Sequence, residues 1–352
     1  MQADVLFILK RKDFPYGDYG NSNYSGDKFC GSMQTGLLNS ANFINEMLQN
    51  NGVFSELVVV HDNNDIDREV TKYKPSFVII EALWVVPEKF DILQRLHPDV
   101  TWVIRLHSAI PFIANEGIAM KWILSYLDHP NVLVSTNDLR LLKELKFLAN
   151  LKPEMPSDKI LYQPNYYPPV FSRKAFNRDS DFIDVGCFGA IRPMKNQLTQ
   201  AIAAVRFADD LGKTLRFHIN GDRIEMKGSP VLHNLIGLFE QIPDHELIMH
   251  DWSKHEDFLA TVASVDIGMQ VSFTETFNIV TADMITQGIP VVASNEVKCS
   301  SNMFSADPNS VDSMVKALKK TYRMPQLNVR LAQSRLRKYD RNSQTVWLSQ
   351  VI

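Results

Sequence analysis

Short runs of Val, Ile and Leu, separated by segments with helical spacing, recur along most of this chain. The run "DVLFIL" (4–9) precedes "TGLLNSANFINEMLQNNG" (35–52), in which apolar residues recur at helical spacing until Asn-Gly ends the pattern. Similar apolar runs follow at 56–62, 76–83, 101–108 and 131–137. Continuous apolar runs between helices are typical of parallel strands that are covered on both faces, so we predict an α/β fold.

The alternation stops once and then starts again, which predicts two domains. Residues 150–181 contain five prolines and no helical period. Further apolar runs then appear at 183–189, 215–221, 246–251, 266–272 and 289–294. We therefore predict two Rossmann-like domains, at 1–165 and 166–334, with parallel sheets facing a central cleft. We expect the C-terminal helix, at about 335–352, to pack back on the first domain.

Composition and cysteine usage restrict the class of protein. The 45% hydrophobic and 22% charged content is that of a globular protein, and a formal charge of −3 excludes a globally basic nucleic-acid coat. Cys30, Cys187 and Cys299 form no CxxC motif, which argues against a disulfide framework or a structural zinc site. No signal peptide is apparent, and no window reaches the roughly 18 apolar residues of a membrane span. We expect a cytoplasmic protein.

The stretch "SFTETFNIVTADMITQGIPVVAS" (272–294) carries the strongest functional signal. Glu275 precedes a predicted helix, Asp283 lies within that helix eight positions later, and a short apolar strand follows. The first turn of a helix presents unpaired N–H groups and the positive end of the helix dipole, so it suits a bound phosphate. The structural alternative makes Glu275 a neighbour of the helix cap and Asp283 a surface acid.

This stretch resembles the E-x7-E signature of retaining GT-B glycosyltransferases of the family-4 type. Glu275 matches the first acid and Phe277 the aromatic residue, and residues 288–293 match the closing Gly-x-Pro-Val-Val-Ala. The chain departs from the signature at Asp283, Thr276 and Asn278, where the family usually has Glu, Gly and Gly.

The resemblance implies that the stretch binds a nucleotide-sugar donor. It places the diphosphate at the backbone amides of Phe277, Asn278 and Ile279, and the sugar hydroxyls at Glu275. The ribose hydroxyls are expected at Asp283. A UDP-sugar is the favoured donor.

A second segment, "FGAIRPMKNQ" (188–197), resembles the family's G-R-L-x-x-x-K-G motif. Lys195 lies six residues after Gly189 and matches the family's diphosphate lysine, whereas Ala190 occupies the arginine position. Arg192, two residues further on, is the candidate to replace that arginine. A metal-free site needs fixed cations beside a diphosphate leaving group, and we expect Arg192 and Lys195 to supply them.

Weaker matches extend the same interpretation. His107 ends the fourth predicted strand, where the family often has a histidine near the donor, and Gly36 opens the first helix, where it can approach a phosphate closely. Trp252 lies in the segment that borders the nucleobase in the family, and Asn165 matches the hinge between the domains. A core histidine, a turn glycine and a packing tryptophan are the structural alternatives.

The resemblance implies a retaining transfer that needs no metal ion or other cofactor. In the mechanism usually proposed for this class, the departing phosphate accepts the proton of the acceptor hydroxyl. The segments "DID" (65–67) and "DSD" (179–181) fit the Asp-x-Asp pattern of metal-dependent transferases. Because both lie in polar segments of a chain rich in acids, we interpret them as solvated loops.

The acceptor is the least constrained part of the prediction. Residues 63–93 resemble stretches of bacteriophage-encoded glycosyltransferases, which implies a hydroxymethylated base in phage DNA and a location in the host cytoplasm. DNA binding requires cations that contact phosphates. The candidate basic face comprises Lys319, Lys320, Arg323, Arg335, Arg337 and Lys338.

Other interpretations remain open at this point. The basic face also fits a solvated helical surface, or a peripheral contact with an anionic membrane beside a lipid-linked or cell-surface glycan. A small-molecule acceptor, a phosphorylase and a non-catalytic nucleotide-sugar-binding protein are further alternatives. A Rossmann dehydrogenase is disfavoured, because no G-x-G-x-x-G follows the first strand.

Overall fold

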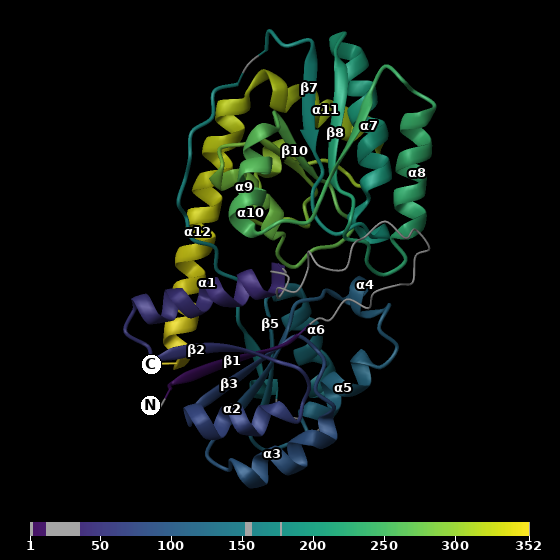
Figure 1. Cartoon of the computed structure of the whole chain (residues 1–352). Helices are drawn as coiled ribbons and strands as arrows, with labels where there is room; N and C mark the ends of the chain where they lie inside the picture. Colours follow the sequence, from purple (N-terminus) through teal and green to yellow (C-terminus); the bar gives the residue numbers. More distant parts are fainter. Residues whose placement is uncertain (1–2, 12–35, 152–156, 177, 352) are drawn as a thin grey trace, which may run out of the picture. The chain divides into compact units, whose positions relative to one another are not determined.

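The computed structural model describes residues 3–11, 36–151, 157–176 and 178–351 (Figure 1). The chain divides into two compact units, one formed by residues 1–166 with 343–352 and the other by residues 167–342. The change of unit at residue 166 falls within the proline-containing segment. Each unit is built on one parallel β-sheet with helices on both faces, which confirms the predicted α/β class.

The sheet of the first unit has six parallel strands in the order β2-β1-β3-β4-β5-β6. Their bounds are β1 Val5–Lys10, β2 Ser55–Val60, β3 Phe77–Glu81, β4 Thr101–Leu106, β5 Val132–Thr136 and β6 Ile160–Tyr162. The five strands predicted before residue 140 are confirmed, with small shifts of their ends. The sequence did not predict β6, because its three residues lie in a segment without a periodic pattern.

Helices cover both faces of this first sheet. The helix α1 (Gly36–Asn50) packs against Val5, Phe7 and Ile79 together with the C-terminal Trp347. Side chains of the other face of the sheet pack against helices that follow β2 to β5. These remaining helices are α2 Asp65–Tyr73, η1 Pro87–Lys89, α3 Phe90–Leu96, α4 Ile110–Ile113, α5 Ala119–Tyr126, α6 Leu139–Asn150 and η2 Ser157–Lys159.

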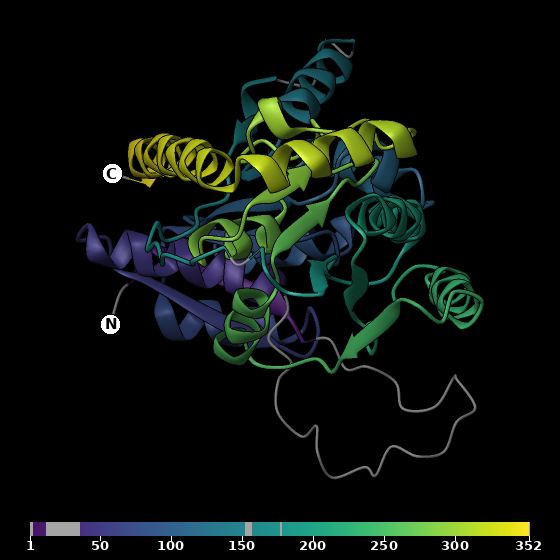
Figure 2. The ribbon, with the colours of Figure 1, turned by 90° about the horizontal axis from the view of Figure 1, so that it is seen from above.

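The sheet of the second unit has five parallel strands in the order β11-β10-β7-β8-β9. Their bounds are β7 Phe182–Gly186, β8 Thr214–Asn220, β9 Glu246–His250, β10 Ile267–Gln270 and β11 Val291–Ala293. The helices are η3 Pro193–Lys195, α7 Gln197–Leu211, α8 Ser229–Glu240, α9 His255–Ser264, α10 Ile279–Thr286, η4 Asn302–Phe304, α11 Val311–Arg323 and α12 Pro325–Val351. Figures 1 and 2 show α7 and α8 together on one side of this sheet and α9 and α10 on the other.

Two further features concern the helices and the cysteines. Within the described ranges, no helix is both long and apolar enough to cross a membrane. Cys187 and Cys299 are buried free thiols, and Cys30 lies outside the described residues.

The strand order fixes where each unit can bind a ligand. In the first unit the chain leaves β1 toward β2 and later returns to β3 on the other side of β1, and in the second unit β7 and β10 are neighbours with the same reversal. Because crossovers between parallel strands are right-handed, the helices on the two sides of such a switch point lie on opposite faces of the sheet. A crevice therefore opens at the carboxyl ends of β1 and β3, and another at those of β7 and β10.

Candidate active site

The crevice of the second unit brings together two charged residues from the predicted motifs. Lys195 ends η3, after β7, and its Nζ lies 2.6 Å from Oε1 of Glu275, which follows β10. Both side chains are nearly buried, with 12% and 7% of their surface exposed. Burial lowers the pKa of Lys195 from its usual value, although the charge of Glu275 opposes that shift. The pair is thus an ion pair in a largely desolvated crevice.

The start of α10 holds the carboxylate of Glu275 in place. The side chain of Asn278 caps this helix, because its Oδ1 accepts the amide of Thr281 at 2.9 Å. Its Nδ2 donates to Glu275 Oε1 at 3.1 Å and to Gln270 Oε1 at 2.8 Å. Asn278, which stands where the family usually has glycine, therefore both ends the loop and fixes the acid.

Two glutamines that the sequence analysis missed connect the loops of this crevice. Gln200 on α7 donates to the carbonyl of Lys195 at 2.8 Å and accepts the amide of Val271 at 2.7 Å. Gln270 at the end of β10 donates to the carbonyl of Phe188 at 2.9 Å. No motif marks these residues, and only the predicted switch point could have indicated that side chains from both loops meet there.

Gly189 occupies the tight turn at which β7 leads into this loop. Its φ of +109° lies in a region that residues with a side chain rarely adopt, and its amide donates to Asn220 Oδ1 at 2.8 Å. A Cβ at this position would meet only Val280, at 3.7 Å. The backbone conformation, rather than crowding, therefore requires glycine here.

Arg192 belongs to a second cluster of charged residues beside Lys195. Its Nη1 lies 3.6 Å from Oε2 of Glu225, and Glu225 also accepts from Arg223 at 2.8 Å. The guanidinium of Arg223 stacks 4.4 Å from the ring centre of Trp252. The structure thus connects the predicted cation Arg192 with the predicted nucleobase neighbour Trp252 through two residues that the sequence analysis did not single out.

Asp283 lies inside α10 and is buried, with 2% of its surface exposed. Its Oδ1 accepts from Tyr167 and from His255 Nε2, each at 2.7 Å. Burial of His255 opposes its positive charge, but its hydrogen bond to Asp283 raises the pKa of His255 above the usual value. Asp283 therefore has internal partners, where the sequence analysis expected ribose hydroxyls, and the ribose contact stays a prediction.

The remaining residues of the motif lie around the start of α10. Ile279 is the first residue of α10, and Phe277 stacks on Tyr339 of α12 at 5.3 Å between ring centres. This stacking fixes the loop that carries the amides of Phe277 and Asn278, which precede the capped turn. Their contact with a diphosphate stays a prediction.

The crevice of the first unit contains a separate cavity of about 240 Å³. Its walls are mostly apolar and include Trp84, and its polar residues include Lys10 and His107. Gly36, the first residue of α1, directly precedes Leu37 of the cavity wall. His107 and Gly36 therefore belong to the first unit, whereas Lys195 and Glu275 belong to the second.

A buried acid that the sequence analysis missed holds His107. Glu81 is fully buried and accepts from His107 Nε2 at 2.5 Å and from Arg105 Nη1 at 3.1 Å. Desolvation would raise the pKa of Glu81, but the charge of Arg105 and the contact with His107 outweigh it and lower this pKa. Desolvation, together with the charge of Arg105, lowers the pKa of His107. Arg105 also donates to Asn165 Oδ1 at 2.8 Å. This places the predicted hinge residue Asn165 in the same buried network.

The predicted DNA-binding face consists of residues on α11 and α12. Lys319 pairs with Asp210 at 2.7 Å, and Lys320 donates to the carbonyl of Met303 at 3.0 Å. Arg335 donates to the carbonyl of Ser300 at 2.9 Å, and Arg337 stacks on Phe171. These four cations have internal partners, although Arg335 and Arg337 are exposed. A contact with DNA stays a prediction.

The prediction of a solvated loop at "DID" (65–67) is wrong, because these residues form the first turn of α2. Asp65 pairs with Arg68 at 2.8 Å, and Asp67 lies 2.8 Å from His97 Nε2. Both acids of this segment therefore have a side-chain partner within the first unit.

The two parallel-sheet α/β units have the GT-B fold of glycosyltransferases, as predicted. Among solved structures, the E. coli trehalose-6-phosphate synthase bound with UDP-2-fluoroglucose is similar, with a TM-score of 0.68 and 9% identity over 99% of this chain and 98% of that chain. Sucrose-phosphate synthase from Thermosynechococcus elongatus gives a TM-score of 0.65 and 12% identity over 99% and 98% of the two chains.

A third similar structure is Anabaena HepE in complex with UDP and glucose, with a TM-score of 0.60 and 12% identity over 98% of this chain and 95% of that chain. No protein-family model and no curated protein matches the chain significantly. At such low identities, the similarity defines the fold.

Proposed function

We propose that this protein is a glycosyltransferase that transfers a sugar from a nucleotide sugar to a hydroxyl group. The observation that carries the proposal is the buried ion pair between Lys195 and Glu275, which lies in the crevice between β7 and β10. Two residues 80 positions apart are brought together at the place where a parallel sheet binds ligands. The fold shared with structures that contain UDP and a sugar supports the same function.

The geometry suggests how a donor would be bound. A diphosphate that enters the crevice competes with Glu275 for the ammonium group of Lys195, since both are anions. Once Lys195 contacts the diphosphate, the carboxylate of Glu275 can accept hydrogen bonds from the sugar hydroxyls. Arg192 supplies a second cation beside the same loop. In a desolvated crevice these charges stabilise the negative charge that develops on the leaving phosphate.

We propose a retaining transfer without a metal ion. The bond between the anomeric carbon and the diphosphate oxygen breaks, and a bond from the acceptor oxygen to the same carbon forms on the same face of the sugar. The acceptor proton passes to the departing phosphate. Positioning and charge stabilisation by the protein then account for most of the rate enhancement.

We assign the acceptor to the cavity of the first unit. Its volume of about 240 Å³ and its apolar walls suit a single ring-shaped group, and Lys10 and His107 offer polar contacts. The acceptors to compare are hydroxymethylated DNA, a lipid-linked glycan and free monosaccharides.

The first experiment screens nucleotide sugars for thermal stabilisation, then measures the release of nucleotide with each acceptor in the presence of a chelator. We expect stabilisation by at least one nucleotide sugar, with UDP-sugars tested first, and turnover that persists in the chelator. Lys195→Met should abolish the stabilisation. If no nucleotide sugar binds, or if Lys195→Met binds the donor as well as the unmodified protein does, the proposal is wrong.

A further inference from the structure

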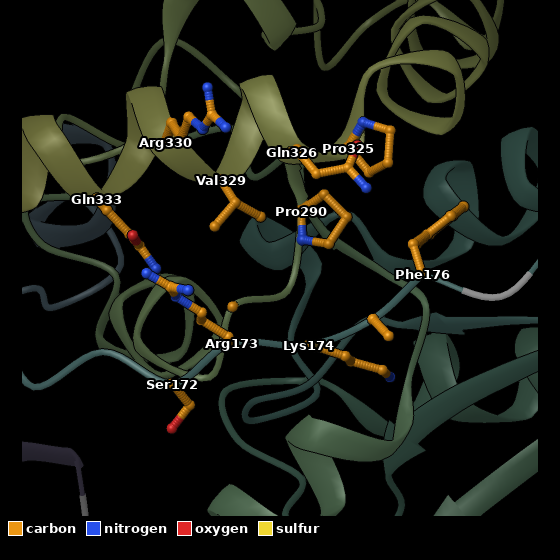
Figure 3. Close-up of a pocket in the computed structure, with 12 residues that line it drawn as sticks. Ser172, Arg173, Lys174, Phe176, Pro290, Pro325, Gln326, Val329, Arg330 and Gln333 are labelled. Atoms are coloured by element: carbon orange, nitrogen blue, oxygen red, sulfur yellow. The ribbon is translucent and has the colours of Figure 1, made fainter.

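A cavity of about 390 Å³ in the second unit is bordered by arginines that do not converge. It lies at the amino end of β11, between Pro290 and the first two turns of α12 (Figure 3). Figure 3 shows Arg173 directed toward Gln333, whereas the side chain of Arg330 lies on the far side of α12. Arginines that do share a partner lie at the opposite end of the strands, in the loops that follow β7 and β8.

These arginines share the acid Glu225 unequally. Oε1 of Glu225 accepts from Nε of Arg223 at 2.8 Å and lies 2.6 Å from Nη2 of the same side chain. Oε2 lies 3.6 Å from Nη1 of Arg192, which is longer than a hydrogen bond. The side chains of Arg223, Glu225 and Arg192 are 13%, 16% and 22% exposed, so solvent screens their charges only in part. Glu225 is therefore hydrogen-bonded to Arg223 and only loosely paired with Arg192.

The position of Arg223 is fixed by its side chain and by its backbone. Its guanidinium lies 4.4 Å from the ring centre of Trp252, a cation–π contact. Its carbonyl accepts from the amide of Ile191 at 2.8 Å, and the amide of Glu225 donates to the carbonyl of Ile191 at 3.0 Å. The loops after β7 and β8 are thus joined beside Arg192, which holds Glu225 at its distance from that residue.

The end of the loop after β8 shows how closely the two loops are packed. Met226 and Lys227 have φ of 44° and 65°, in the left-handed region that residues with a side chain rarely adopt. A Cβ at Gly228 would lie 2.0 Å from the carbonyl oxygen of Ile191, so only glycine permits the backbones to approach this closely. Because strained residues persist only where their surroundings hold them, the surrounding structure constrains the loop that carries Arg223.

Arg192 and Lys195 lie close enough to contact the same anion. The amide of Lys195 donates to the carbonyl of Arg192 at 3.0 Å. Burial lowers the pKa of Lys195, the charge of Glu275 opposes this shift, and the nearby charge of Arg192 adds to it. A diphosphate has two charged groups and can therefore contact both cations. Since guanidinium groups bind carboxylates and phosphates with the same hydrogen-bond geometry, a carboxylate bound to Arg192 would compete with the diphosphate.

We propose that Arg223 is a positioning residue of the donor site, which binds the carboxylate of Glu225 and so leaves Arg192 available to the diphosphate. This inference rests on the proposed function, because it assumes that the nucleotide sugar binds at Arg192 and Lys195. Without Arg223, Glu225 moves the short distance to Arg192 and forms with it the hydrogen bonds that a phosphate would otherwise make. Arg223 thus acts on the donor only through Glu225 and Arg192.

The experiment measures the binding of inorganic pyrophosphate and of UDP to the full chain by isothermal titration calorimetry, at constant ionic strength and with a chelator. Arg223→Met releases Glu225, and Arg223→Met/Glu225→Gln removes the competing charge as well. Arg192→Met and Arg192→Met/Arg223→Met show whether Arg223 acts through Arg192. Arg206→Met is the matched control, because it removes an exposed arginine of the same unit that pairs with Asp312 at 2.8 Å. Thermal unfolding verifies that all variants are folded.

We expect Arg223→Met to weaken the binding of both probes by about tenfold or more, since Glu225 then occupies Arg192 through hydrogen bonds between charged groups. Arg223→Met/Glu225→Gln should regain most of the lost affinity. Arg223→Met should cause no further loss in protein that already carries Arg192→Met, and Arg206→Met should bind both probes as the unmodified protein does.

A loss of affinity in Arg223→Met that Glu225→Gln does not restore would show a purely structural role and overturn the inference. The inference is also overturned, while the proposed function stands, if UDP-sugars are turned over and Arg223→Met binds pyrophosphate as tightly as the unmodified protein does. Restored affinity without transfer from any nucleotide sugar would support the role of Arg223 and contradict the transferase. If the unmodified protein binds neither pyrophosphate nor UDP, the inference is wrong, whatever the thermal-shift screen of nucleotide sugars shows for the proposed function.

Discussion

The ion pair between Lys195 and Glu275 allows its roles in stability and in function to be separated. Both side chains are almost buried, and their charged atoms are 2.6 Å apart. Lys195→Met leaves the carboxylate of Glu275 without its cation in a desolvated crevice, where the amide of Asn278 still donates to Oε1 at 3.1 Å. Removing one partner of a buried pair costs about 3–5 kcal/mol, so we expect a loss of that order in the free energy of unfolding.

The two single variants, Lys195→Met and Glu275→Gln, should lose different amounts of unfolding free energy. Glu275→Gln leaves the ammonium group of Lys195 unpaired, but burial already lowers its pKa. Because this buried amine can lose its proton, Glu275→Gln should cost less free energy of unfolding than Lys195→Met, and less at pH 9 than at pH 7. The double variant Lys195→Met/Glu275→Gln leaves neither charge and should be more stable than Lys195→Met alone.

Activity should not follow stability in this cycle. If Lys195 contacts the leaving diphosphate and Glu275 the sugar, every variant should lose about 10²-fold or more in turnover, including the double variant that regains stability. Urea unfolding followed by tryptophan fluorescence gives the stabilities, and release of nucleotide gives the activity. Unfolding costs that simply add would show that the two charges are not coupled, and a double variant with near-normal turnover would refute their catalytic role.

Three further perturbations have defined outcomes. Burial raises the pKa of Asp340 to about 8 from 3.8, so on raising the pH the unfolded state loses this proton before the folded state does. The free energy of unfolding should therefore fall by about 1.4 kcal/mol per pH unit between roughly pH 4 and 8. Asp340→Asn should lack this decline, and identical pH profiles of the two proteins in urea unfolding would contradict the assignment. Trp347 is fully buried and donates to the carbonyl of Pro164 at 2.8 Å. Trp347→Ala should therefore cost about 3–5 kcal/mol in unfolding free energy, and Trp347→Phe should cost less. Equal losses in the two variants would show that the ring does not stabilise the core. Gly189→Ala should lower the free energy of unfolding by about 1–3 kcal/mol, because φ is +109° at this position. The variant should also bind the donor more weakly in the thermal-shift assay. An unchanged melting temperature would show that the turn tolerates a side chain.

Much of the fold could be predicted because parallel strands leave a local signal. Runs such as residues 76–83 and 101–108 are apolar on both faces, so their burial in a covered sheet follows from the sequence. The strand β6 could not be predicted, since three residues carry too little pattern. The C-terminal helix was predicted only from about residue 335, whereas α12 begins at Pro325.

The candidate site was predicted only in part. The motif spacing identified Glu275 and Lys195, and the structure brings them within 2.6 Å. Glu81 and Gln200 were missed, because a lone acid or amide in a strand or helix has no distinctive spacing. For Asp283 the spacing predicted a ribose contact; the structure shows Tyr167 and His255 as its partners, and the ribose contact stays a prediction.

The sequence by itself determined the α/β class, the two sheets and the loops that carry the candidate residues, because hydrophobic periodicity and glycine or proline positions act over a few residues. Only the tertiary structure decided which side chains meet. The strand order places residue 195 beside residue 275. Such contacts depend on the packing of distant elements, and no local pattern encodes that packing.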